Sequence, residues 1–482
     1  MPSKRTIISS LFWKYLERMG TQITQFVVSI VLARILAPDD FGLVAIVTIF
    51  IALANVFVQS GLNTALIQKK DSDDLDFASV FIASFSLAGV LYIVLFFTAP
   101  VLAEFYHKEH LTPILRVLSL LLFLGSINSI QLAYISRHMM FKKLFFRSLG
   151  AIIPSGAIGI ACAAGGLGAW ALVAQQLSNM SLAIIIMWFT VPWRPQLQFS
   201  FNRLKGLLSF GWKLLLSSLI DSGYENLRGL LIGKMFTPAD LAFYNRGDHF
   251  PNIVVCNVNS TIQSVMLPSL AAHQDDKPQV KRLMRRAIIT SSFLILPLMT
   301  GLAIAAKPLV LVLLGEKWLP TVPYIHAYCF VYAFYPIHTS NLSAINAMGR
   351  SDIFLKLEII KKAYGIALLV AVLLYFKSPI GIAYGVCVSS VISSIVNAFP
   401  NKRLVQYSYL EQFKDIFPSV FLTAVMGVVL YLISLVDTSP YLTLVLEGIV
   451  GIVCYIGLAK ILHFECLDYL IKTIKEFTDK NA

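Results

Sequence analysis

The chain has 482 residues, of which 57% are hydrophobic and 13% are charged, and its mean hydropathy is +0.74. Soluble globular domains carry about 25% charged residues, so this composition excludes an ordinary soluble domain and indicates a protein whose solvent is lipid. The net charge of +13 does not require a nucleic-acid partner, because basic loops that face anionic lipid headgroups account for it.

Fourteen predominantly apolar segments follow one another along the chain, each about the length of one membrane crossing. A transmembrane helix needs about 20 such residues. The sequence therefore predicts an all-α polytopic membrane protein with about 14 transmembrane helices. The predicted spans are 10–34, 41–62, 77–103, 112–135, 147–164, 168–191, 207–235, 240–264, 286–305, 322–346, 356–376, 380–398, 415–436 and 441–463.

The basic residues support this arrangement, because they gather in alternate connections between the spans. One side carries Lys4, Arg5, Lys69, Lys70, Arg137, Lys142, Lys143, Arg147, Arg194, Arg203, Lys205, Lys277, Lys281, Arg282, Arg285, Arg286, Arg350, Lys356, Lys361, Lys362, Lys402, Arg403, Lys414, Lys460, Lys472, Lys475 and Lys480. The other side carries only Arg34, Lys108, Arg116, Lys234, Lys307, Lys317 and Lys377. Cytoplasmic loops carry the excess of Lys and Arg, so both termini are predicted to be cytoplasmic.

Several other classes of protein find no support in the sequence. The six cysteines show no paired spacing, so we expect neither a disulfide framework nor a metal site. The phosphate-binding pattern Gly-x-x-x-x-Gly-Lys-Ser/Thr does not occur, and we expect no cofactor. The connections are too short to fold as separate domains, and the tail from Leu462 to Ala482 is expected to form an interfacial helix.

An internal repeat divides the chain. Trp13-Lys14 is matched by Trp212-Lys213, and Pro38-x-Asp40 is matched by Pro238-x-Asp240 about 200 residues later. Each match falls at the same place in its half: the Trp-Lys pair enters a long helix, and the turn with Pro and Asp follows that helix and opens the next one. We therefore predict an N-terminal lobe over 1–200, a C-terminal lobe over 201–400, and spans 13 and 14 with a tail over 401–482.

Polar residues inside the membrane are costly and mark functional sites or partners. They concentrate in spans 1, 7 and 8, at helical spacing. The candidate substrate-binding residues are Arg18, Gln22, Gln25, Arg228, Asn245 and Arg246. The candidate ion-coupling carboxylates, which would alternate between protonated and ion-paired forms, are Asp221, Glu225 and Asp248.

Structural explanations compete with these roles. Asp221, Glu225 and Arg228 can satisfy one another along one helix, and Arg246 can pair with Asp248. His249 fits a satisfied core histidine, and Glu447, alone in its span, fits a buried protonated acid. The aromatic row of span 10 fits either a sugar-binding surface or a membrane-interface belt; it comprises Tyr324, His326, Tyr328, Tyr332, Tyr335 and His338.

Two motifs carry a family resemblance: Leu32-Ala-Arg-Ile-Leu-Ala-Pro-Asp-Asp-Phe-Gly-Leu43, and Leu231-Ile-Gly-Lys-Met-Phe-Thr-Pro-Ala-Asp-Leu-Ala-Phe-Tyr-Asn-Arg246. With them the chain resembles the Wzx-type flippases, in the polysaccharide-transporter branch of the multidrug/oligosaccharidyl-lipid/polysaccharide exporter superfamily, and above all the colanic-acid and teichuronic-acid export group. Ala242 stands where the group more usually has Gly.

The resemblance implies two pseudo-symmetric, MATE-like lobes around a central cavity in the bacterial inner membrane. The implied substrate is an undecaprenyl-diphosphate-linked oligosaccharide, moved from the cytoplasmic to the periplasmic leaflet by alternating access. The implied partners are that lipid-linked sugar, membrane lipid, and the polysaccharide polymerase and export machinery. Arg18, Arg228 and Arg246 would then face the diphosphate, since the guanidinium fork matches phosphate oxygens.

Two other functions remain open at this stage. A cation-coupled multidrug antiporter of the same superfamily would favour acidic groups and a cavity without an excess of arginine. A membrane glycosyltransferase or polymerase would need a large external loop that carries catalytic groups, and the external connections here are short. The sequence therefore favours a transporter that performs no covalent chemistry.

Overall fold

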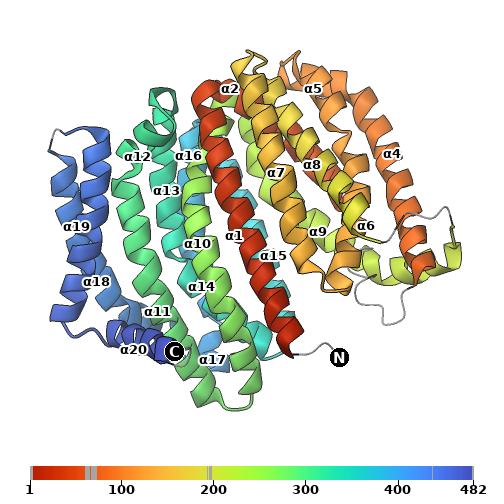
Figure 1. The fold of residues 1–482 in the computed structure, drawn as a ribbon. Coiled ribbons are helices and arrows are strands. Elements are labelled where there is room, and N and C mark those ends of the chain that lie inside the picture. The colour runs from red at the N-terminus through yellow and green to blue at the C-terminus, as the bar shows by residue number, and fades with distance from the viewer. Residues whose placement is uncertain are drawn as a thin grey trace. The chain divides into compact units, whose positions relative to one another are not determined.

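The computed structural model describes residues 4–59, 66, 73–192, 194, 198–436 and 438–479. These residues form helices joined by short connections, and no strand occurs among them (Figure 1). The chain divides into two compact units, unit 1 over residues 1–242 and unit 2 over residues 243–482. Lys69, Lys70 and Lys480, which were assigned to basic connections and the tail, lie outside the described residues.

Unit 1 is built on two groups of packed helices. In one group α7 packs against both α1 and α8, and in the other α9 packs against α2 and α4. Phe77, Ile130 and Met187 belong to a buried apolar cluster in this unit. The helices are α1 (Lys4–Ile35), α2 (Pro38–Gln59), α4 (Asp74–Tyr106), α5 (Leu111–Leu118), α6 (Leu121–Arg137), α7 (Phe141–Ala164), α8 (Ala169–Thr190) and α9 (Phe201–Met235).

Unit 2 is organised around α11, which packs against α13, α14 and α18. The pair α18 and α19 lies side by side, with α20 across one end (Figure 1). The helices are α10 (Pro238–Ala272), whose first turn belongs to unit 1, α11 (Lys277–Ile304), α12 (Ala306–Leu313), the 3-10 helix η1 (Glu316–Thr321), α13 (Val322–Ala333), α14 (Tyr335–Ala347), α15 (Ser351–Tyr375), α16 (Pro379–Ala398), α17 (Asn401–Leu404), α18 (Tyr409–Ser434), α19 (Pro440–Ile461) and α20 (Glu465–Asp479).

The predicted all-α membrane fold is confirmed. Each predicted span overlaps a described helix, and 10 of the described helical segments are long and apolar enough to cross a membrane. The other predicted spans coincide with α1, α9 and α15, which carry charged residues, and with α13 and α14, which divide the range 322–346 at Phe334. The structure describes α20 within the predicted tail helix.

The repeated Pro-x-Asp motif forms the same local structure twice. At the start of α2 the backbone N–H of Ala37 donates to Asp40 Oδ2 over 3.1 Å. At the start of α10 the N–H of Thr237 donates to Asp240 Oδ2 over 3.0 Å. Each aspartate satisfies a backbone donor that the helix start leaves unpaired, which explains why the motif begins a helix in both places.

The two repeated turns also contact each other within unit 1. A Cβ atom added to Gly42 would lie 1.7 Å from the carbonyl oxygen of Pro238. Only a glycine therefore permits this approach of α2 to the start of α10. The division of the chain at residue 200 followed the repeat and stays a prediction, while by its contacts α9 packs within unit 1.

Candidate functional site

The most polar stretch of α10 lies where this helix approaches α13 most closely. A Cβ atom on Gly247 would lie 2.2 Å from Tyr324 Cβ and 2.9 Å from the Tyr324 carbonyl carbon. The glycine therefore allows the two helices to touch. Its neighbours Arg246 and Asp248, both partly buried, are fixed next to this contact.

Arg246 lies against an aromatic ring. Its guanidinium carbon is 5.6 Å from the centre of Trp318, a fully buried ring of η1 that also packs edge-on against Phe243. A guanidinium is attracted to the face of a tryptophan and is more weakly hydrated than an ammonium. The position therefore suits a cation that exchanges water for a bound anion.

Asp248 is held by hydrogen bonds from α13. Tyr332 donates its hydroxyl proton to Asp248 Oδ1 over 2.8 Å, and Asn252 Nδ2 donates to the Tyr332 oxygen over 2.7 Å. Hydrogen bonds donated to a carboxylate stabilise its ionised form. This chain of donors therefore fixes Asp248 as an acceptor in the α10–α13 contact.

The aromatic row of span 10 divides between the interior and the surface. Tyr324, Tyr328 and Tyr332 are buried, and Tyr244 of α10 packs edge-on against Tyr324 and Tyr328, with ring centres 6.1 and 5.6 Å apart. His326 is exposed. The three buried rings thus serve the α10–α13 contact and are not spread over a membrane interface.

The candidate residues of unit 1 lie on α1 and α9. Arg18 and Gln25 are exposed on α1 and Gln22 is partly buried, while the neighbouring Glu17 accepts a 2.7 Å hydrogen bond from Ser148 of α7. On α9, Asp221 and Glu225 are exposed, and the partly buried Arg228 donates to the Tyr224 hydroxyl over 3.3 Å. Asn245 and His249 of α10 are exposed. The substrate and coupling roles of these residues stay predictions.

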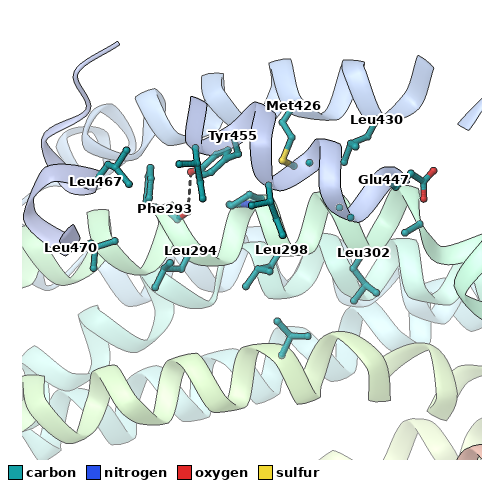
Figure 2. Close-up of a pocket in the computed structure, with 18 of the residues that line it drawn as sticks. Phe293, Leu294, Leu298, Leu302, Met426, Leu430, Glu447, Tyr455, Leu467 and Leu470 are labelled. Carbon is teal, nitrogen blue, oxygen red and sulfur yellow. Dashed lines mark hydrogen bonds between the residues drawn. The ribbon is translucent and has the colours of Figure 1, made fainter. Parts of the chain in front are cut away.

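Unit 2 also contains an apolar pocket of about 610 Å³ between α10, α11, α18, α19 and α20. Leu467 and Leu470 of α20 lie at one end, and Leu302 and Glu447 lie toward the other (Figure 2). Nearly all of the lining is hydrocarbon, and among the lining residues that the structure describes Glu447 is the one that carries an ionisable carboxyl group. Pockets of this size accommodate small ligands or lipid segments.

A family model described as "polysaccharide biosynthesis protein" matches residues 31–323, more than half of the chain. The chain belongs to this family. The teichuronic acid biosynthesis protein TuaB of Bacillus subtilis (strain 168) is 25% identical over 471 residues, covering 95% of this chain and 96% of the relative. The succinoglycan biosynthesis transport protein ExoT of Rhizobium meliloti (strain 1021) is 26% identical over 319 residues, covering 65% of this chain and 64% of the relative.

Solved structures with the same fold include two kinds of transport protein. The lipid II flippase MurJ superposes with a TM-score of 0.75 at 15% identity, covering 96% of this chain and 99% of its own. A multidrug resistance transporter of the MATE family superposes with a TM-score of 0.61 at 12% identity, covering 80% of this chain and 94% of its own. The family resemblance and the MATE-like fold predicted from the sequence are thereby confirmed.

Sequence reasoning missed a polar cluster inside unit 1 of this family member. Arg147 was assigned to a basic connection, but it lies in α7, where it donates to Asn128 of α6 and its buried Nε has no partner among the described residues. Gln131 of α6 is 1% exposed, and its amide is likewise without a described partner. The signal was present in the polar row 126–131 within an otherwise apolar span.

A second missed cluster lies in unit 2. Lys361 was counted among the basic residues of one side although it falls within the predicted span 356–376; it lies within α15 and pairs with Glu358, three residues earlier on the same helix, over 2.5 Å. On α14, Asn341 is fully buried and exchanges two hydrogen bonds with Gln412 of α18, at 2.8 and 3.0 Å, while Asn401 donates to the same Asn341 oxygen over 2.7 Å. These amides join α14, α17 and α18.

The connection before α18 adds a charged network. Arg285 of α11 pairs with Asp415 over 2.6 Å, and the same carboxylate accepts a 2.7 Å hydrogen bond from Tyr407. Burial, together with this bond to Asp415, raises the pKa of the Tyr407 hydroxyl above its usual value. The phenol therefore remains a donor to Asp415, the carboxylate through which Arg285 joins α11 to α18.

Proposed function

We propose that the chain is a flippase for undecaprenyl-diphosphate-linked oligosaccharide repeat units. It moves them from the cytoplasmic to the periplasmic leaflet of the bacterial inner membrane by alternating access, for the synthesis of an exopolysaccharide or capsule-type polysaccharide. The polysaccharide polymerase and export machinery then use the translocated units. No covalent step is required of the chain itself.

Family membership supports the class of cargo. The relatives carry names from teichuronic acid biosynthesis and succinoglycan transport, and a protein with the same fold over nearly the whole chain is a lipid II flippase. The likeness to a multidrug transporter is one of fold, at 12% identity. A lipid-linked saccharide is therefore favoured over a drug as the cargo.

The observation that carries the proposal is the position of Arg246, a cationic side chain of α10. A diphosphate that leaves water needs fixed cations to replace its hydration. Arg246 is partly buried, lies on the face of Trp318, and sits next to the glycine that fixes its helix against α13. We assign the diphosphate to Arg246, with Arg18 and Arg228 as further ligands and with Gln22, Gln25 and Asn245 toward the sugar.

Deletion of the gene tests the cargo directly. The deletion strain should accumulate complete repeat units on undecaprenyl diphosphate at the cytoplasmic leaflet, and the wild-type gene should clear them. Loss of a glycosyltransferase would give truncated units, and loss of a polymerase would give complete units at the periplasmic leaflet. Either of those results would overturn the proposal, and so would normal polysaccharide with impaired drug efflux.

The orientation is part of the proposal. Reporter fusions are expected to report cytoplasm after Lys70, Lys143, Lys205, Arg286 and Lys362. They are expected to report periplasm near His107, Gly166, Pro238 and Glu316. One inverted reporter would contradict the fourteen-span topology at that point.

A further inference from the structure

Glu447 is a carboxyl group without a described partner in an apolar pocket. It lies on α19, is 3% exposed, and neither of its carboxyl oxygens has a hydrogen-bond partner among the described residues. The pocket beside it is lined by α10, α11, α18, α19 and α20 and is almost wholly hydrocarbon (Figure 2). A buried polar group in this setting requires an explanation.

An ionised carboxylate is not stable in such surroundings. Moving an unpaired charge from water into a hydrocarbon environment costs far more than burying a neutral polar group, so an isolated carboxyl there takes up a proton. Asp248 is the contrasting case, because Tyr332 donates to it over 2.8 Å. Of these two acids, Glu447 is the one whose surroundings favour the neutral form.

The helices packed against α19 offer Glu447 no charged partner within the pocket. Tyr455 is the other ionisable side chain in the lining, and its hydroxyl donates to the Phe293 carbonyl over 2.9 Å. It lies eight residues, or about 12 Å, along the helix from Glu447. α11 has no ionisable residue from Ala287 to Ile304. α10 contributes Val254 to the lining. The remaining ionisable residues on these elements line no part of the pocket; among them are Arg246, Asp248 and His249 on α10, Lys307 on α12, Tyr431 on α18, and Tyr469 and Lys472 on α20.

The pocket leaves space next to the acid. Gly448 follows Glu447 directly, and a Cβ added to Gly448, or to Gly301 on α11, would meet no other atom within 4 Å. A cavity of about 610 Å³ is large enough for several water molecules. Water that enters through this space would hydrate the carboxylate and permit it to release its proton.

We propose that Glu447 is a proton-binding site of unit 2. Glu447 is protonated and neutral when the pocket is dry, and it releases its proton when water enters the pocket. The site is separate from the coupling candidates Asp221, Glu225 and Asp248. A role for this proton in driving transport rests on the proposed flippase function, whereas the protonation of Glu447 does not.

Chemical labelling tests the protonation alone. Dicyclohexylcarbodiimide reacts with protonated carboxyls in apolar surroundings, and peptide mass spectrometry locates the adduct. In full-length protein in phospholipid nanodiscs, we expect an adduct on Glu447 that is lost in Glu447→Gln and diminishes as the buffer is made alkaline. Glu358, paired with Lys361 at 2.5 Å, is the matched control and is expected to remain unlabelled.

Three results would overturn the proton site. They are no adduct on Glu447, equal labelling of Glu447 and Glu358, and labelling that is independent of pH. Infrared spectroscopy detects the neutral acid without any label, because a protonated carboxyl group has a carbonyl stretching band that a carboxylate lacks. That band is expected in the wild type and absent from both Glu447→Gln and Glu447→Leu; a band that persists in both would place the neutral acid elsewhere.

Reconstituted transport tests the coupling. Flipping of an undecaprenyl-diphosphate-linked oligosaccharide is measured in proteoliposomes with and without an imposed pH gradient. We expect the ratio of the two rates to exceed unity for the wild type and to fall to unity for Glu447→Gln. A ratio that is unchanged in the variant would overturn the coupling role. If the wild type moved no lipid at all, the proposed function would fail, while the labelling result would stand.

Discussion

Asp248 and Glu447 are two acids in membrane helices of the same unit, and their surroundings are opposite in packing and in hydrogen bonding. Asp248 lies in a tight contact between α10 and α13, where a glycine allows the helices to touch and Tyr332 donates to the carboxylate. Glu447 lies beside a pocket, and a Cβ added to the adjacent Gly448 would meet open space. The comparison teaches that the hydrogen-bond partners and packing around an intramembrane acid determine its role. The presence of the acid in the sequence does not.

The two glycines provide the sharpest test of this contrast. In Gly247→Ala the new methyl group would lie 2.2 Å from Tyr324 Cβ and 2.9 Å from its backbone carbon, so the helices must separate. We expect a loss of more than about 3 kcal/mol, the upper end of ordinary overpacking, and little folded protein after purification in detergent.

Gly448→Ala is the matched control, because it makes the same change next to the other acid. Apart from its adjacent residues and the backbone of its own helix, no atom lies within 4 Å of the new methyl group, and alanine is better than glycine in a helix by about 0.5–1 kcal/mol. The variant is expected to unfold at the same or a slightly higher temperature. Equal losses in the two variants would show that the packing contrast is wrong.

Arg246 tests whether the tight contact serves function. Arg246→Ala is expected to abolish or strongly reduce surface polysaccharide at wild-type protein levels, as is Arg18→Ala. Lysine at either position should restore export in part, because the charge is kept while the bidentate fork is lost. Quantified polysaccharide and immunoblots provide the measurement. Wild-type export with alanine at Arg18, Arg228 and Arg246 together would show that these arginines are structural.

The partners of the two acids allow a stability comparison of intermediate size. Tyr332→Phe removes the donor to Asp248 and the acceptor of Asn252, and it is expected to cost about 1–3 kcal/mol because buried polar groups lose their partners. Glu447→Leu removes an acid without a described partner and is expected to gain about 1–3 kcal/mol. Thermal unfolding in the same detergent measures both, and shifts of the same sign would refute the contrast.

The smallest effect is expected at an exposed ion pair. Arg350 donates two hydrogen bonds to Asp352, at 2.9 and 2.8 Å, and these bonds lower the pKa of the Asp352 carboxyl to about 2. A lowered pKa contributes stability above the unfolded value of 3.8 that is lost only as the pH falls through about 2. Because the pair is fully exposed, Arg350→Ala should leave the unfolding temperature unchanged at neutral pH. A drop comparable to that of Tyr332→Phe would contradict this ranking.

The sequence predicts the features that depend on nearby residues. Hydropathy located ranges that all overlap described helices, because a span is a local property, and the Pro-x-Asp motif predicted the starts of α2 and α10, because the aspartate bonds to a backbone N–H three residues away. Of the candidate site residues, the structure joins Arg246 to Trp318 and Asp248 to Tyr332. Both partners lie more than a span away, so periodicity in α10 did not reveal them.

Other features needed the folded chain. Arg147 was counted with a cluster of basic residues at the start of its predicted span, while the packing of α7 brings it to Asn128 of α6, 19 residues away. Asn341 and Gln412 are 71 residues apart and pair only because α14 and α18 both pack on α11. A polar residue in an apolar span indicates that a partner exists, but the sequence alone does not identify that partner.

The contact between Gly42 and Pro238 has a consequence for dissecting the protein into fragments. A cut at residue 200, at the repeat boundary, would remove the turn that covers Gly42 and leave the start of α2 with an uncovered notch. A cut after residue 242 would keep both turns on one fragment. For split-gene complementation, the second cut is therefore the one from which a well-folded N-terminal piece is expected.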